Sequence, residues 1–246
     1  MRTDRSVAVT GAAGGMGALI VRRFLANGDT VIATDIASEG LERLKDAQAP
    51  SAKLHVVAAD VSDEADCGRV AELARRTAGR VDVLVSAAGF FPVQPFDTLT
   101  AADFRRVVDV NLTGVFLTIK AVTPLLRGRG WGRIVIIGSA STFEGVADQV
   151  PYVAAKAGLF GMARSLARVL GKDGITVNVV TPGLTLTPPI KQTMPAEMIE
   201  QQVKLRAISR DERAEDLVGA VFFLASPDAD FISGQTVNVD GGKHML

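Results

Sequence analysis

Short apolar runs recur along the chain and alternate with longer segments of helical periodicity. The runs are rich in β-branched residues and nearly continuous, which is typical of parallel strands buried on both faces. We predict seven strands: Val7–Thr10, Val31–Thr34, Leu54–Ala59, Val81–Val85, Ile134–Ile137, Val177–Val180 and Thr236–Val239. Strands that alternate with helices indicate βαβ units with right-handed crossovers. The expected fold is therefore α/β: a doubly wound, seven-stranded parallel sheet with helices on both faces, in one domain over residues 1–246.

The predicted helices carry recognisable ends. Gly28 is expected to cap the first helix at its C-terminus. Thr100 and Asp103 have the spacing of a capping box and predict the start of one long helix. Ser209 and Glu212 have the same capping-box spacing and predict the start of a later helix.

Composition and charge exclude several classes of protein. The chain has 246 residues, 48% hydrophobic and 22% charged, and no run of 18 or more apolar residues, so we expect a soluble protein without membrane contact. Lysine plus arginine and aspartate plus glutamate each number 27, so no basic field would hold nucleic acid. Cys67 and two histidines offer no zinc-ligand spacing, and no metal is expected. The start lacks a signal-peptide core, which predicts a cytoplasmic protein.

A glycine-rich turn follows the first predicted strand. The sequence TGAAGGMG, from Thr10 to Gly17, runs directly into the first helix. A helix N-terminus with glycines before it can hold a pyrophosphate, although the pattern also fits a simple tight turn. Its place in a doubly wound chain favours dinucleotide binding, with contacts from Gly11, Gly14, Gly15, Met16 and Gly17.

Asp35 closes the second predicted strand, where a carboxylate can accept both hydroxyls of the adenosine ribose. A 2′-phosphate there would meet like charge, on the order of 4 kcal/mol at about 4 Å and an effective dielectric constant of about 20. No arginine or lysine occupies 12–16 or 36–38. NAD is therefore predicted rather than NADP. Asp60 could accept from the adenine amino group; for both aspartates the alternative is a helix cap.

Three side chains suggest acid–base chemistry. Tyr152, the only tyrosine, and Lys156 share one helix face, and a nearby ammonium is expected to lower the pKa of the phenol. Ser139 ends the fifth strand and could meet Tyr152 at one substrate oxygen. Asn111 interrupts the apolar stripe of the long helix, and it either has a structural role or holds water near the site.

The chain resembles the short-chain dehydrogenase/reductase family over essentially its whole length, through TGAAGGMG, Asp60-Val61, Asn111, Ser139, YVAAK, Pro182-Gly183 and GQTVNVDGG. The resemblance implies a Rossmann fold and catalysis by four residues. Ser139 would orient the substrate oxygen and Tyr152 would be the general acid/base. Lys156 would bind the nicotinamide ribose and lower the pKa of Tyr152, and Asn111 would support a proton-relay water.

The resemblance also implies further contacts with NAD, from Ile36, Val61, Ala87, Ala88, Gly89, Pro182, Gly183, Thr185 and Thr187, besides Tyr152 and Lys156. One departure is Ser86-Ala87-Ala88-Gly89, where the family usually has Asn-Asn-Ala-Gly. Two side-chain amides that brace this turn are lost, so we expect a less rigid turn. The resemblance further implies a homotetramer.

The residues expected around the substrate are Phe91, Ser141, Phe143, Gln149 and Leu184, with 184–206 as the candidate substrate lid. This largely apolar set favours an apolar, aromatic or cyclic secondary alcohol or ketone. A 3-oxoacyl-carrier-protein reductase is the alternative, because Arg127, Arg129 and Arg133 could meet an acidic carrier. A non-catalytic NAD-binding regulator is a more remote alternative.

Overall fold

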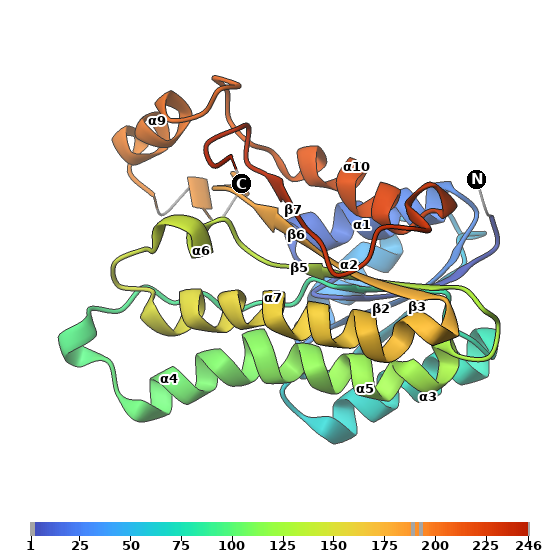
Figure 1. Ribbon diagram of the computed structural model, residues 1–246. Helices are drawn as coiled ribbons and strands as arrows, with labels where there is room; N and C mark the ends of the chain where they lie inside the picture. The colour runs from blue at the N-terminus through green and yellow to red at the C-terminus, as the bar shows by residue number, and fades with distance from the viewer. Residues whose placement is uncertain (1–2, 188–189, 192–193, 246) are drawn as a thin grey trace.

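The computed structural model describes residues 3–187, 190–191 and 194–245, which form one domain around a parallel sheet (Figure 1). The strand order is β3-β2-β1-β4-β5-β6-β7. The strands are β1 Ser6–Thr10, β2 Thr30–Asp35, β3 Leu54–Ala58, β4 Val83–Ser86, β5 Gly132–Ile137, β6 Ile175–Pro182 and β7 Thr236–Val239. All seven predicted strands are confirmed, with small shifts at their ends.

Helices cover both faces of the sheet, as predicted (Figure 1). One face carries α1 Gly15–Ala26, α2 Ser38–Asp46 and α10 Ala214–Leu224. The other carries α3 Glu64–Ala78, α4 Ala101–Val108, α5 Gly114–Leu126 and α7 Val150–Leu170. The shorter elements are η1 Phe96–Thr98, η2 Asp109–Thr113, α6 Ser141–Glu144, η3 Gly171–Asp173, α9 Ala196–Lys204 and η4 Pro227–Ala229.

The hydrophobic core consists of two layers, one on each side of the sheet. Alternate residues of a strand point to opposite faces, so Val7 and Val9 of β1 join the layer that contains Phe24 of α1, and Ala8 joins the layer that contains Ile119 of α5. The central strands are buried along their whole length. The outer strands β3 and β7 are only partly buried.

The long helix predicted from Thr100 is not one regular helix. Its capping box is confirmed, with the Asp103 N–H donating to the Thr100 hydroxyl. Between α4 and α5, however, lies a π-helical turn, η2, with Asn111 at its centre. The Asn111 amide donates to the Val107 carbonyl one turn earlier, at 2.9 Å. The buried amide thus has a partner within the wide turn. Single π-helical turns within α-helices are frequent at functional sites.

Within the described residues, one helical segment, Ala101–Leu126, is long and apolar enough to cross a membrane. In this fold its α5 portion packs on the sheet: Val115, Ile119 and Val122 are buried in one of the two core layers. The inward side of α5 is therefore part of the core, whereas Phe104 and Phe116 of the same segment are exposed.

Two expected helix ends have different outcomes. Gly28 follows the C-cap residue Asn27 of α1 in a left-handed conformation, with φ of +85°, which a glycine adopts at little cost. The predicted capping box at Ser209 and Glu212 is wrong. Helix α10 begins at Ala214, and Asp216 accepts the N–H of Arg213 instead. Glu212 is buried, and its carboxylate accepts from a threonine hydroxyl elsewhere in the fold.

A buried ion pair joins the segment that leads into β1 to the loop before β2. We predict that breaking it greatly lowers the free energy of unfolding. Arg5 donates to both carboxylate oxygens of Asp29, and both side chains are almost fully buried. Asp29→Ala would leave the Arg5 charge without its partner and lower the free energy of unfolding by about 3–5 kcal/mol in urea titrations. The exposed control Asp46→Ala should change it by less than about 0.5 kcal/mol. Equal effects of the two substitutions would contradict the stabilising role of the Arg5–Asp29 ion pair.

Candidate active site

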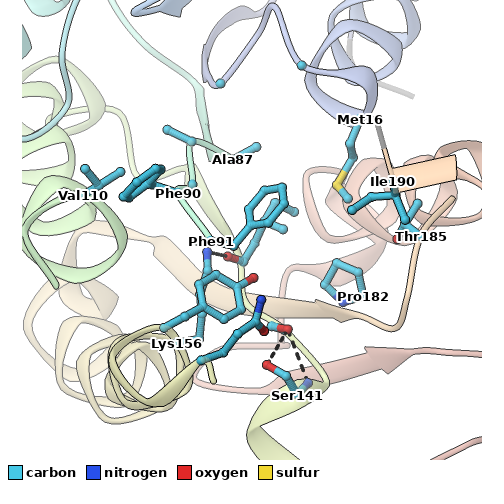
Figure 2. A pocket seen from close by; sticks show the side chains of 18 of the residues that line it. Met16, Ala87, Phe90, Phe91, Val110, Ser141, Lys156, Pro182, Thr185 and Ile190 are labelled. Carbon is cyan, nitrogen blue, oxygen red and sulfur yellow. Dashed lines mark hydrogen bonds between the residues drawn. The ribbon is translucent and has the colours of Figure 1, made fainter. Parts of the chain in front are cut away.

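A cavity of about 1730 Å³ lies at the carboxyl ends of the strands. It is larger than a typical small-ligand pocket, so a dinucleotide and a substrate can share it. In Figure 2, Met16, Thr185 and Ile190 lie on one side of the cavity and Phe90 and Val110 on the other. The cavity brings together the predicted cofactor residues Gly11, Gly14, Gly15, Met16, Gly17, Asp35, Ile36, Asp60, Val61, Ala87, Ala88, Gly89, Tyr152, Lys156, Pro182, Gly183, Thr185 and Thr187.

The glycine turn has the shape of a phosphate cradle. Gly11 has φ of +67°, and a Cβ there would lie 2.7 Å from the Ala87 backbone. A Cβ on Gly17 would lie 2.0 Å from the Gly11 carbonyl oxygen. Helix α1 begins at Gly15 with Gly14 as its N-cap, a residue without a side chain to accept the first N–H groups. These N–H groups, with the positive end of the helix dipole, fit the oxygens of a pyrophosphate.

Asp35 is held at the edge of the cavity by two backbone groups. One carboxylate oxygen accepts the Ala13 N–H of the glycine turn and the other accepts the Ala37 N–H, each at 3.0 Å. The N-cap of α2 is Ala37, so the alternative of a helix cap does not describe Asp35. Asp60 likewise is not a helix cap, because Asp63 caps α3. Both carboxylates are positioned at the cavity.

The turn after β4 is braced without the two amides that it lacks. The Thr10 hydroxyl accepts the N–H groups of Ala87 and Ala88, each at 3.1 Å. The Asn111 amide donates to the Phe90 carbonyl at 2.6 Å and accepts the Phe90 N–H at 3.2 Å. The expected loss of rigidity is therefore offset. Asn111 is buried and holds the turn from behind, which supports the structural role among those considered.

Two elements, β5 and α7, bring the acid–base residues together. Ser139 follows β5, and α7 presents Tyr152 and Lys156 on one face. The Lys156 ammonium donates to the Ile137 carbonyl at 2.9 Å and lies 5.7 Å from the centre of the Tyr152 ring. The Ser139 hydroxyl is 2.8 Å from the Ser141 hydroxyl. A phenol, an ammonium and a hydroxyl thus meet at one wall of the cavity.

The predicted lowering of the tyrosine pKa is not found in the protein alone. Burial raises the pKa of the Tyr152 phenol, and a hydrogen bond from Ser139 opposes this rise. Burial also lowers the pKa of the Lys156 ammonium to about 8. Both shifts favour neutral forms because a poorly solvated site disfavours either charge. In the protein alone, the hydrogen bond from Ser139 is the contact that favours the phenolate and lowers the pKa of Tyr152.

The substrate end of the cavity contains most of the residues predicted for it. Ser141, Gln149 and Leu184 line it, and the Phe91 ring meets the Tyr152 ring edge-on at 6.2 Å. Phe143, which was expected near the substrate, does not line this cavity. It lies in a separate depression, stacked on Phe160 at 5.8 Å and against His244, because α6 is a single turn whose other side carries Ser141 to the cavity.

The predicted lid is only partly covered by the structure. Pro188, Pro189, Gln192 and Thr193 lie outside the described residues. The described part contributes Leu184, Ile190, Met194, Met198 and Gln202 to the cavity. Thr185 also lines the cavity, but its hydroxyl donates to Glu212 at 2.7 Å, so its backbone is the part available to a ligand.

Sequence reasoning missed that the residues after β7, from Asp240 onward and here called the chain end, contribute to the cavity. Lys243 and His244 line the cavity together with Glu144 of α6. Asp240 accepts the N–H groups of Gly242 and Lys243 and turns the chain back toward the cavity. The Asp-Gly-Gly sequence after the last strand is a turn signal that could have indicated this return.

Comparisons with known proteins define the family to which the chain belongs. Residues 11–244 match a family model described as enoyl-(acyl carrier protein) reductase. Levodione reductase of Leifsonia aquatica is 34% identical over 98% of this chain and 94% of that protein. The 3-oxoacyl-acyl-carrier-protein reductase FabG of Salmonella typhimurium is 35% identical over 97% of this chain and 96% of its own length.

Solved structures agree with this assignment. A crystal structure of levodione reductase superposes with a TM-score of 0.93 at 33% identity, covering 99% of this chain and 98% of that one. A glucose/ribitol-type dehydrogenase from Brucella melitensis gives 0.93 at 30% identity, with the same coverage. The chain belongs to the short-chain dehydrogenase/reductase family, whose members are oxidoreductases that typically bind nicotinamide cofactors.

The single tyrosine allows a direct test of the Ser139 contact. Ser139→Ala removes the hydrogen bond that lowers the pKa of the phenol, so we predict that the pKa of Tyr152 rises. An ultraviolet titration of phenolate absorbance reports this residue alone. Ser165→Ala, at an exposed position of the same helix, should leave the titration unchanged. A lower or unchanged pKa in Ser139→Ala would show that the contact does not stabilise the phenolate.

Proposed function

We propose that the protein is an NAD-dependent oxidoreductase that transfers a hydride between nicotinamide and a secondary alcohol or ketone, with an apolar, aromatic or cyclic substrate. The observation that carries the proposal is the meeting of Ser139, Tyr152 and Lys156 beside a glycine cradle in one cavity. Each feature alone is common, but their combination places an acid–base group next to a dinucleotide site. It also argues against a non-catalytic regulator.

The residues around the cradle fit NAD. The N-terminus of α1 would hold the pyrophosphate and Asp35 the adenosine ribose. The basic side chains among the described lining residues come from α4, α7 and the chain end rather than from the turns around Asp35: Arg105, Arg106, Lys156, Lys243 and His244. A 2′-phosphate would therefore face the carboxylate uncompensated. When bound, the nicotinamide supplies or accepts the hydride.

The acid–base step belongs to Tyr152. In oxidation its phenolate takes the proton from the substrate hydroxyl, and in reduction its phenol protonates the developing alkoxide. Ser139 donates to the same substrate oxygen, and its partner Ser141 fixes its direction. Lys156, held by the Ile137 carbonyl, would hold the nicotinamide ribose and keep positive charge beside the phenol. Asn111 acts through the Phe90 backbone and positions the turn under the cofactor.

The apolar lining favours a compact, neutral substrate. Phe91 contacts Tyr152, and Leu184, Met194 and Met198 line the same cavity. Such a surface gains free energy by covering hydrocarbon, about 25 cal/mol per Å². The similarity to levodione reductase, whose name specifies a diketone, supports a ketone substrate.

Reduction of a 3-oxoacyl group on a carrier protein is the second candidate, supported by the similarity to FabG. The arginines expected to meet the carrier do not favour it. Arg127 pairs with Asp173, Arg129 with Asp82, and Arg133 is buried against Asp230. All three precede or begin β5 and thus lie at the amino ends of the strands, opposite the cavity. A panel of cyclic ketones and acyl thioesters, followed by NADH absorbance, separates the two candidates.

The proposal includes a cytoplasmic homotetramer. Its support in this chain is a set of apolar side chains on α4 and α5 that solvent reaches in the single subunit. Phe104 is 38% exposed and Phe116 is 45% exposed. Burial of such rings between subunits would stabilise an assembly.

The cofactor preference gives a testable prediction. We expect kcat/KM to be at least about tenfold higher with NAD(H) than with NADP(H), because Asp35 repels the 2′-phosphate. Asp35→Ala combined with Ile36→Arg should shift the preference toward NADP(H), since Ile36 is exposed at the cavity and an arginine there would meet the phosphate. Steady-state kinetics with both cofactors measure this. Equal use of the two by the natural chain would refute the assignment of Asp35.

The mechanism gives another prediction. Tyr152→Phe keeps the ring and its contact with Phe91 but removes the acid, so kcat should fall by roughly 10²- to 10⁴-fold. The far-ultraviolet circular dichroism spectrum and the Kd for NADH should stay close to those of the natural protein. Phe91→Leu is the matched control: it changes the packing on the ring and keeps the phenol. Near-normal turnover by Tyr152→Phe on a substrate that the natural protein converts would refute the role of the phenol.

A further inference from the structure

Helix α9 covers the substrate end of the cavity but is weakly held by packing. Its residues Met198 and Gln202 line the cavity. All nine residues of α9 are described, and none of them is buried. In Figure 1 it stands apart from the helices that pack on the sheet. Isolated helices shorter than about 12–15 residues are marginal in water, so tertiary contacts decide whether α9 keeps its place.

One such contact is made by Lys243 in the chain end. Its ammonium donates to the Gln202 side-chain oxygen on α9 at 2.8 Å, and to both carboxylate oxygens of Glu144 on α6, at 2.8 and 2.6 Å. Only 9% of the Lys243 side chain is exposed. A single charged group therefore joins three segments that are far apart in the sequence: α6, α9 and the residues after β7.

The chain end that presents Lys243 is itself fixed. Asp240, buried directly after β7, accepts the N–H groups of Gly242, Lys243 and His244, each at 3.0 Å. It also lies 2.7 Å from Nδ1 of the His244 ring. The turn is thus attached to the edge of the sheet, and Lys243 extends from a rigid base rather than from a loose tail.

The geometry distinguishes a structural tie from a substrate contact. An ammonium has three N–H donors, and in this structure three protein oxygens face it. A substrate could reach Lys243 only by displacing Glu144 or Gln202. In addition, Glu144 and Asp240 beside it disfavour an anionic substrate group.

We propose that Lys243 fastens α9 over the substrate end of the cavity and is a positioning residue for substrate enclosure. Its loss would shift α9 toward an open arrangement. If the closed arrangement binds substrate, the apparent affinity falls in proportion to the closed fraction. Saturating substrate would restore closure, so KM should change more than kcat. This kinetic consequence rests on the proposed function, whereas the position of α9 does not.

Limited proteolysis tests the position of α9 without any substrate. Trypsin cleaves after Lys204, the exposed last residue of α9, and mass spectrometry measures the rate. In Lys243→Met and in Gln202→Ala we expect cleavage to accelerate by about tenfold, equivalent to ~1.4 kcal/mol. The double variant should be no faster than either single variant, because both remove the same contact. Lys243→Arg should restore most of the protection.

Two matched controls isolate the contact. Gln201→Ala changes the neighbouring, exposed glutamine of α9, and Lys172→Met removes an exposed lysine in η3. Both should be cleaved at the natural rate. Unchanged cleavage in Lys243→Met and Gln202→Ala, or additive effects in the double variant, would overturn the proposal.

Kinetics on the best ketone of the panel supply the second measurement. Lys243→Met and Gln202→Ala should raise the KM for the ketone by about tenfold, with kcat and the KM for NADH changed less than threefold. A raised KM without faster cleavage at Lys204 would indicate that Lys243 and Gln202 contact the substrate directly. It would overturn the proposal that Lys243 holds α9 in place. If the natural protein converts no substrate, the proposed function fails, and proteolysis still decides the role of Lys243.

Discussion

Helices cover both faces of β1, β4, β5 and β6, and every residue of these strands is buried. Burial of a polar group is costly unless it is paired, so the interior of the sheet has little room for chemistry. Parallel pairing collects the carboxyl ends of the strands at one edge, where polar residues can follow each strand. The cradle, the carboxylates and the acid–base residues all depend on this arrangement.

At that edge, one kind of interaction is used repeatedly: a side-chain oxygen accepts backbone N–H groups of a neighbouring turn. Thr10 does this for the turn after β4, Asp35 for the glycine turn and Asp240 for the chain end. Asn111 holds the Phe90 backbone in the same way. Most of these side chains stand behind or beside the cavity surface, so the turns around Tyr152 are held by side chains that pair with backbone N–H groups.

The sequence predicts the fold and the cavity wall well because both follow from local patterns. Continuous apolar runs define strands buried on two faces, and the spacing of Tyr152 and Lys156 follows from the helical repeat. Contacts that depend on side-chain direction or on distant segments could not be predicted. Phe143 faces away from the cavity because α6 is one turn long, and Lys243 reaches Gln202 only through the folded chain end. The raised pKa of Tyr152 depends on burial, which no spacing reveals.

The π-helical turn at Asn111 also fixes the rotation of one helix relative to another. Each residue of an α-helix advances the chain by about 100° around its axis, since a turn takes 3.6 residues. The wide turn η2 absorbs extra chain between α4 and α5, so that Val115, Ile119 and Val122 point at the sheet while α4 keeps its own orientation. If this turn closed into a regular helix with all its residues retained, the residues of α5 would turn by about 100° and carry the apolar side of α5 away from the core. The amide that holds the Phe90 backbone therefore lies in the same turn that sets the phase of the longest helical segment, Ala101–Leu126.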